Sequence, residues 1–252
     1  WIIFLISMVM EGLRWFLAVL LPLFAGFAAL AGVVALEAFF RNRLKELFND
    51  TNYFIFFFLV WGYILYALGE VSFYLTTTLF PGKKGIEDFY WSAGALLIVV
   101  SFAVLTFTLF RQYPDNRKFT TLALAGGVMF LTVLFVLFGI TFRTAEGYFF
   151  GYFYPIISSF IVTFALSAVL FSPQLTDFGS ALFVFFLASC AILLGDLFFT
   201  FATAQGTQAA GLAGLFGDLF YAIGYAVSGI AFVVLRLRLH ELAFGRSGSL
   251  QK

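Results

Sequence analysis

Seven long apolar runs, separated only by short polar breaks, constrain the fold of this chain more than any other feature of its sequence. Each run is long enough to cross the hydrocarbon core of a bilayer, which takes about 20 mostly apolar residues in a helix. The breaks carry the glycine, proline, asparagine and charged residues that form turns, and they are short, so consecutive helices should be antiparallel neighbours. The predicted spans are 15–40, 53–80, 88–110, 119–142, 148–171, 178–204 and 210–235.

The composition agrees with a bilayer as the solvent. Hydrophobic residues make up 63% of the 252 residues and charged residues only 11%, whereas a soluble domain carries about 25% charged residues. A soluble fold of this length could not cover so much apolar surface. The net charge of +1 also lacks the basic excess that nucleic-acid binding requires.

We therefore predict an all-α fold, an integral membrane bundle of seven transmembrane helices forming a single transmembrane domain over residues 1–252. Within it, residues 1–14 are an interfacial lead-in, 15–235 form the seven-helix bundle, and 236–252 form a short basic cytoplasmic tail. The apolar stretch 1–10 is too short to span; a signal-sequence remnant and the end of a truncated earlier helix remain alternatives for it.

The distribution of basic residues predicts the orientation, because cytoplasmic loops carry an excess of Lys and Arg. One end of the bundle has ten such residues: Arg41, Arg43, Lys45, Arg111, Arg117, Lys118, Arg236, Arg238, Arg246 and Lys252. The other end has four: Arg14, Lys83, Lys84 and Arg143. The N-terminus is then outside and the C-terminus cytoplasmic, as an odd number of spans requires. We expect a multi-pass protein of the cell membrane.

Two segments share a pattern that predicts an internal repeat. Leu68-Gly69-Glu70 is followed after a hairpin by Asp88-x-aromatic-aromatic-x-x-Gly94, and Leu194-Gly195-Asp196 is followed by Asp218-x-aromatic-aromatic-x-x-Gly224. The copies lie on spans 2–3 and 6–7. An offset of four spans keeps them in the same orientation, which predicts a parallel repeat about an axis along the membrane normal.

Acidic residues within the spans predict a candidate site. Glu70, Asp196 and Asp218 lie roughly 12–16 Å from the outer ends of their helices at 1.5 Å rise per residue, and Asp88 lies nearer the outer mouth. A carboxylate there costs about 2.5–3.5 kcal/mol or more unless it faces the bundle interior and finds a partner. Protonation, a cation, a cationic ligand or hydroxyl groups could compensate it.

Tyrosines near these acids complete the candidate site. Tyr66 and Tyr74 lie one turn either side of Glu70, and Tyr221 and Tyr225 follow Asp218 on one helix face. Two interpretations stay open at this point. The acids and aromatics line a ligand or ion pocket open to the outside, or hydroxyl-bonded acids hold helix pairs together.

Several chemistries are disfavoured by residue types. The only histidine, His240, lies beyond the last span, and Cys190 is the only cysteine, so we expect no haem, no metal site and no intrachain disulfide. No lysine lies in a span to form a retinal Schiff base. Without a nucleophile–base set, we predict no enzyme activity and no cofactor.

The ordered pattern resembles the seven- or eight-span membrane sensor region found at the N-terminus of bacterial and archaeal diguanylate cyclases and histidine kinases. The matching residues are Gly69-Glu70, Asp88-Phe89-Tyr90, Tyr154-Pro155, Gly195-Asp196 and Asp218-Leu219-Phe220-Tyr221. The resemblance implies an input module that passes a conformational signal inwards. The chain departs from the family after residue 235, where only about 16 residues follow. Either the output domain is not included in this sequence, or the bundle acts through a partner.

The leading hypothesis is a sensor or receptor-like module that binds an unknown ligand or cation and signals through a protein partner, on the cytoplasmic face or within the membrane. An accessory or structural subunit of a membrane complex and a proton- or cation-coupled transporter are the alternatives. All three hypotheses predict that the chain contacts the lipid bilayer and that it does not bind nucleic acid. Each is compatible with a homo- or hetero-oligomer.

Overall fold

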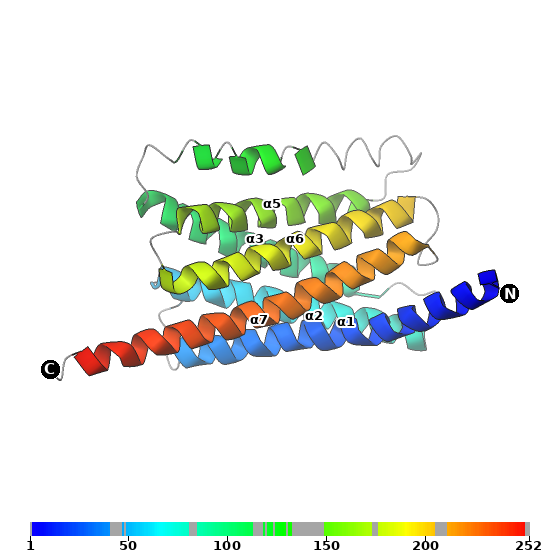
Figure 1. Ribbon diagram of the computed structural model, residues 1–252, viewed down its shortest axis with the longest axis horizontal. Coiled ribbons are helices and arrows are strands. Elements are labelled where there is room, and N and C mark those ends of the chain that lie inside the picture. The colour runs from blue at the N-terminus through cyan, green and yellow to red at the C-terminus, as the bar shows by residue number, and fades with distance from the viewer. Residues whose placement is uncertain are drawn as a thin grey trace.

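The computed structural model describes residues 2–40, 47, 49–80, 85–112, 118, 120–122, 124–129, 131–132, 149–172, 176–204 and 211–249. Over these residues the fold is all-α and contains no strand. The long helices run side by side as an elongated bundle (Figure 1). They are α1 (Ile2–Phe40), α2 (Thr51–Leu79), α3 (Glu87–Gln112), α5 (Phe149–Phe171), α6 (Thr176–Ala204) and α7 (Leu212–Ser249).

Six of the seven predicted spans are confirmed as helices long and apolar enough to cross a membrane. The predicted fourth span, 119–142, lies largely outside the described residues, although those described between 120 and 129 are helical and apolar. The count of seven crossings therefore stays a prediction. The helical residues fit the six apolar runs closely because each run is bounded by turn-forming residues.

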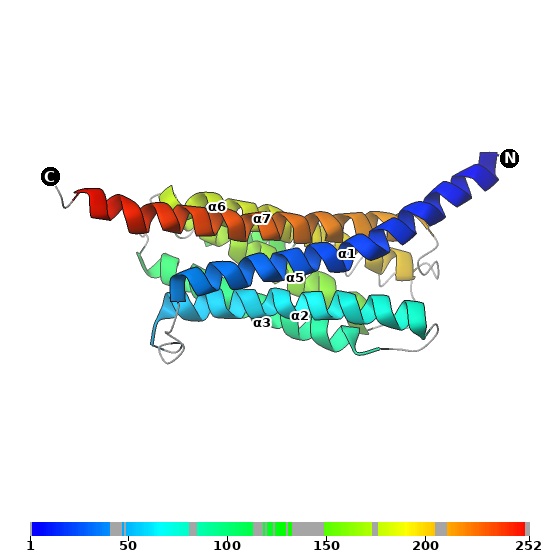
Figure 2. The same cartoon turned by 90° about the horizontal axis from the view of Figure 1, so that it is seen from below.

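The two terminal helices extend further than the predicted spans. Helix α1 begins at Ile2, so the lead-in of residues 1–14 is helical from that residue and continuous with the first span. Helix α7 continues to Ser249, so much of the tail 236–252 is helical as well. Both helices project beyond the bundle, at opposite ends (Figure 2). Termini at opposite ends agree with an odd number of crossings.

Helix ends follow from local sequence. Asp50 caps α2, since its side chain accepts hydrogen bonds from the backbone N–H groups of Asn52 at 2.9 Å and Tyr53 at 3.3 Å. The helix ends at Leu79, two residues before Pro81, which disfavours helical geometry in the residue it follows. Helix α3 has acidic residues in its first turn and Arg111 in its last, an arrangement that complements the helix dipole.

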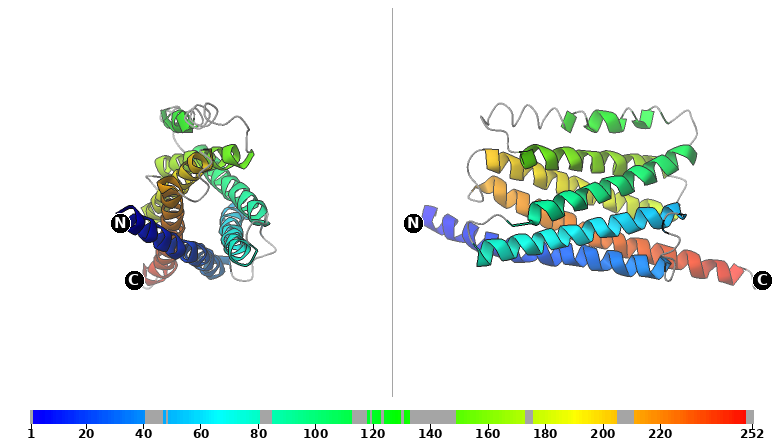
Figure 3. Two further views of the ribbon diagram at one scale, coloured as in Figure 1. Left: turned by 90° about the vertical axis from the view of Figure 1, so that its right-hand side faces the viewer. Right: turned by 180° about the vertical axis from the view of Figure 1, so that it is seen from behind.

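Neighbouring helices form a closed ring. In order around the ring, α1 packs on α2, α2 on α3, α3 on α5, α5 on α6, α6 on α7, and α7 on α1. The end-on view shows these helices surrounding a common interior (Figure 3). Side chains from helices far apart in sequence therefore meet inside the ring.

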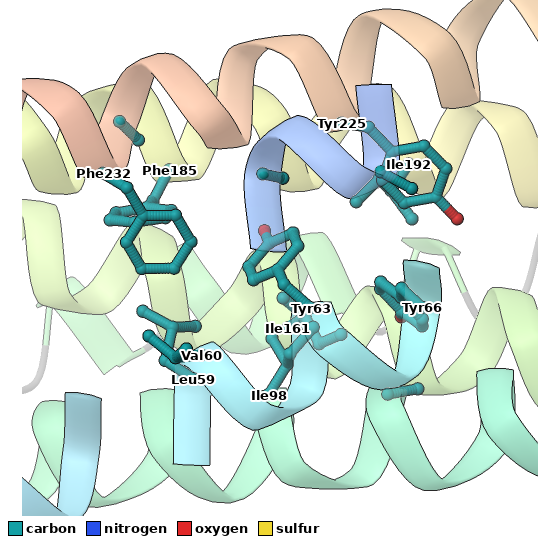
Figure 4. Close-up of a cluster of buried hydrophobic side chains, with 14 of the residues drawn as sticks. Leu59, Val60, Tyr63, Tyr66, Ile98, Ile161, Phe185, Ile192, Tyr225 and Phe232 are labelled. Atoms are coloured by element: carbon teal, nitrogen blue, oxygen red, sulfur yellow. The ribbon is translucent and has the colours of Figure 1, made fainter. Parts of the chain in front are cut away.

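A layer of large apolar side chains closes the middle of the bundle (Figure 4). Tyr63, Phe102, Phe185 and Phe232 are each at most 1% exposed. Their rings meet edge to face, with centroids 5.4 Å apart for Tyr63–Phe232 and 4.9 Å for Phe185–Phe232, a favoured aromatic geometry. We call these four residues the aromatic layer. Polar groups beside it are satisfied, because Ser228 Oγ donates to the hydroxyl of Tyr63 at 2.7 Å.

Candidate functional site

A cavity of about 80 Å³ lies beside the aromatic layer, towards the end of the bundle where α1 begins. Three labelled residues of its wall, Tyr66, Ile192 and Tyr225, lie on that side of Tyr63 and Phe232 (Figure 4). We call this cavity the acidic–aromatic pocket. Five helices contribute its lining, which is Tyr66, Glu70, Asp88, Trp91, Tyr154, Ile192, Asp196, Phe199, Tyr221 and Tyr225.

Glu70 links α2 to α7 in this pocket. Its side chain is 5% exposed, and Oε1 accepts a hydrogen bond from the Tyr225 hydroxyl at 2.7 Å. The ring of Tyr66, one turn earlier on α2, meets the Tyr225 ring at 5.9 Å between centroids. A buried carboxyl group is costly unless it is hydrogen-bonded. The sequence placed Tyr225 on the face of Asp218, whereas in the structure its hydroxyl bonds Glu70 of another helix.

Asp196 links three helices. It is 5% exposed on α6, its Oδ1 accepts from the Tyr221 hydroxyl of α7 at 2.6 Å, and its Oδ2 accepts from Ser158 Oγ of α5. Ser158 was absent from the predicted site. Span 5 contains two adjacent serines, Ser158 and Ser159, and nothing in their spacing distinguishes the one that faces Asp196.

Asp88 links α3 to α5 at the edge of the pocket. Its Oδ1 accepts from the Tyr154 hydroxyl at 2.9 Å, and that hydroxyl also lies 3.5 Å from Ser92 Oγ. Tyr154 is the residue before Pro155 in α5. The hydroxyl-capped acids therefore connect five helices across the interior of the ring.

Trp91 is a pocket residue that sequence reasoning missed. It lies on α3 beside the Glu70 carboxyl, and its buried Nε1 has no hydrogen-bond partner among the described residues. A buried indole N–H usually has a partner. The pocket therefore places an indole N–H beside the Glu70 carboxyl, close enough to interact with it but outside regular hydrogen-bond geometry. Its position three residues after Asp88, equivalent to Tyr221 after Asp218, was the available signal.

Two predicted site residues lie outside this pocket. Asp218, on α7, lies near Arg14 of α1 as well as near Glu70, and Tyr74 lines a separate cavity between α1 and α2. Four residues of an α-helix turn through about 400°, so Tyr74 is rotated by roughly 40° from Glu70. That rotation directs it towards α1. The other six predicted residues, Tyr66, Glu70, Asp88, Asp196, Tyr221 and Tyr225, all line the pocket.

Glycines place an aromatic ring against the residue before each buried acid. A Cβ atom on Gly195 would meet Tyr221 Cδ1 at 2.7 Å, and a Cβ on Gly69 would overlap the Trp91 ring in the same way. Gly94 lets α3 approach α2, because a Cβ on it would lie 2.8 Å from Gly62 O. Gly224 lets α7 approach α6, because a Cβ on it would lie 3.3 Å from Ala188 O. Small residues of this kind permit close approach of membrane helices.

The chemistry of the lining favours positive or N–H-rich groups. Three carboxyl groups and several aromatic rings surround the cavity, and among the described residues no lysine or arginine lines it. Such a site can attract a cation by charge and by the aromatic quadrupoles. The described residues contain no group of three or more His, Cys, Asp or Glu suited to a metal ion.

Comparisons with protein-family models, with curated proteins and with solved structures find no match to this chain.

Proposed function

We propose that the chain is a membrane sensor or receptor-like module that binds a small cation or cationic ligand in the acidic–aromatic pocket and signals through a protein partner. One observation carries the proposal. A cavity inside the helix ring is lined by Glu70, Asp88 and Asp196 together with six aromatic side chains, and by no basic residue. Binding a cation there would compensate charges that are expensive to place within a membrane.

The volume of the pocket limits the size of the ligand. An engineered cavity of about 150 Å³ in another protein holds benzene, and this pocket has about half that volume, 80 Å³. Ammonium, methylammonium or a monovalent ion that has lost most of its water fits such a space, since one water molecule takes up about 30 Å³. The Nε1 of Trp91 offers a further contact to a ligand that also carries a hydrogen-bond acceptor.

The hydrogen bonds at the pocket supply a route for a signal. Tyr221 and Tyr225 of α7 donate to acids on α6 and α2. A cation that binds these carboxyl groups competes with the tyrosine hydroxyls for them. Its binding therefore changes the hydrogen bonds that hold α7 against α6 and α2. Helix α7 extends out of the bundle at its C-terminal end (Figure 2), where a partner could detect the change.

The two glycine–aromatic contacts support the proposed parallel repeat of spans 2–3 and 6–7. In each helix pair, the ring three residues after an aspartate lies against the glycine before an acid. The ten-to-four bias of basic residues supports a pocket facing outwards and a C-terminus in the cytoplasm of a cell-membrane protein. These features, with the resemblance to membrane sensor regions, favour the sensor hypothesis.

The aromatic layer argues against the transport alternative. Beyond the pocket, the described residues enclose a void of about 10 Å³, lined by isoleucines and tyrosines and by two serines, Ser158 and Ser189, and this volume is about the smallest that holds one water molecule. A coupled transporter needs polar groups that continue a pathway. An accessory subunit, in which the capped acids only hold helices together, remains the alternative that the following experiment separates.

Thermal unfolding of the purified protein in detergent tests the proposal. Sodium, ammonium, methylammonium and tetramethylammonium chlorides are added at constant ionic strength. A ligand at about ten times its dissociation constant stabilises by about 1.4 kcal/mol, which raises the melting temperature by roughly 3–6 °C for a chain of this size. We expect ammonium or methylammonium to do so and tetramethylammonium, too large for the cavity, to have no effect.

Matched variants locate the effect. Glu70→Gln and Asp196→Asn should abolish the response, whereas Glu37→Gln, at an exposed site on α1, should retain it. Equal melting temperatures in all four salts, or a response that survives both pocket substitutions, would show that the acids are structural and would favour the accessory subunit.

A further inference from the structure

A second cavity, of about 330 Å³, lies between α1 and α2 at the end of the bundle where α1 begins. It is lined by Arg14, Trp15 and Ala18 of α1 and by Tyr74, Thr77 and Thr78 of α2, and it shares no lining residue with the acidic–aromatic pocket. In this region the N-terminal part of α1 leans away from α2 (Figure 2). The cavity is therefore a wedge between two diverging helices.

Arg14 gives this wedge its charge. One guanidinium nitrogen, Nη2, donates to the Gly211 carbonyl oxygen at 3.1 Å, which ties α1 to the start of α7. The neighbouring Nε is buried and has no hydrogen-bond partner among the described residues. A buried donor on a charged group costs free energy until an acceptor reaches it. Asp218 lies near this guanidinium but does not line the wedge.

The remaining lining suits an oxygen-rich anion. Three hydroxyl-bearing side chains surround the space, and no carboxylate lines it. The Thr77 hydroxyl donates within its own helix, to Phe73 O at 2.8 Å and Tyr74 O at 3.1 Å, so it is not a free donor for an anion. Tyr74 and Thr78 can donate. Guanidinium and hydroxyl groups together are the donors that phosphate oxygens prefer.

The depth of the wedge identifies the source of such an anion. Thr77 and Thr78 are the third-last and second-last residues of the apolar stretch Thr51–Leu79, and Arg14 of α1 lines the wedge beside them. Trp15 is 60% exposed on the outer surface of α1, and tryptophan is enriched where membrane and water meet. The wedge therefore lies at the level of lipid headgroups and opens between helices that face the bilayer.

We propose that this wedge binds the phosphodiester of an anionic phospholipid, with Arg14 as the charged contact and the Tyr74 and Thr78 hydroxyls as further donors. The lipid sits between α1 and α2 and fills the space left by their divergence. The site is independent of the cation pocket, since it has the opposite charge and different residues.

Native mass spectrometry of the delipidated protein tests this proposal. The probes are phosphatidylglycerol, phosphatidylcholine, diacylglycerol and inorganic phosphate. We expect one tightly retained phosphatidylglycerol, weaker retention of phosphatidylcholine, and none of diacylglycerol. Arg14→Gln should weaken phosphatidylglycerol retention about tenfold or more, because a hydrogen bond to a charged group contributes about 1.5–3 kcal/mol.

Two further variants keep the proposal testable if Arg14→Gln perturbs the fold. Tyr74→Phe, which removes one hydroxyl, should weaken retention by a smaller factor, and Arg236→Gln, an exposed arginine at the far end of α7, should leave it unchanged. The proposal is overturned if Arg14→Gln and Tyr74→Phe both retain lipid as the unsubstituted chain does, if diacylglycerol binds equally well, or if inorganic phosphate competes at the same concentration.

Discussion

At the scale of single residues, the interior is defined by carboxyl groups that meet hydroxyl groups from other helices. Glu70 accepts from Tyr225, Asp196 from Tyr221 and Ser158, and Asp88 from Tyr154. In the low dielectric of the bundle such bonds are strong, and an acid that loses its donor is costly. Individual hydroxyls should therefore contribute measurably to stability.

Removing one hydroxyl tests this directly. Tyr225→Phe and Tyr221→Phe each leave a buried carboxyl group short of a donor, which should destabilise the protein by about 1–3 kcal/mol. Denaturant-induced unfolding in detergent measures the effect, with Tyr90→Phe, a tyrosine of α3 outside the pocket lining, as the control. Equal stability of all three variants would mean that the tyrosine bonds contribute nothing.

At the scale of elements, close helix pairs hold the acids in place. Trp91 packs on Gly69 and Tyr221 packs on Gly195, so α3 approaches α2 and α7 approaches α6 through the residue before each acid. An aromatic ring can lie there only because glycine has no side chain. The pairing explains why a Gly-acid sequence recurs in both helix pairs.

Gly69→Ala and Gly195→Ala should each destabilise the protein, by about 1–3 kcal/mol, because the added methyl group overlaps an aromatic ring. Gly26→Ala is the matched control, since nothing lies within 4 Å of its added Cβ, and alanine favours a helix by about 1 kcal/mol over glycine. Thermal unfolding should therefore show a lower melting temperature for Gly69→Ala and Gly195→Ala and a higher one for Gly26→Ala. A higher melting temperature for all three variants would contradict the close packing.

At the scale of the whole molecule, the ring of helices gathers its buried carboxyl groups towards one end. The acidic–aromatic pocket and the wedge between α1 and α2 both lie towards the end where α1 begins, and the aromatic layer lies next to the pocket. The molecule is thus open to small ligands at one end. If the basic-residue bias determines the insertion, that end faces outwards.

Cysteine labelling in cells tests the orientation. In a Cys190→Ser background, a cysteine replacing Trp1 should react with a membrane-impermeant maleimide in intact cells, and one replacing Lys252 only after permeabilisation. Labelling of both positions in intact cells, or the reverse order, would contradict the predicted topology.

The apolar runs by themselves determined the all-α class and the bounds of six helices to within a few residues, except at the two terminal extensions, because a bilayer leaves a long apolar segment no other stable backbone conformation. Residue type and helix periodicity likewise brought Tyr66, Glu70, Asp88, Asp196, Tyr221 and Tyr225 onto the candidate list. An acid within a span must find a partner, and a tyrosine on a neighbouring turn is a natural one.

Tertiary structure decided which of these residues meet. Trp91 lines the pocket and Ser158 donates to Asp196 because the rotation of α3 and α5 about their axes turns these side chains inwards. That rotation depends on packing against neighbouring helices. Tyr74 lies outside the pocket and lines the wedge together with Arg14, where α1 diverges from α2. A single sequence contains the periodicity of each helix, but the angle at which one helix faces the next is set by side chains far away in the chain.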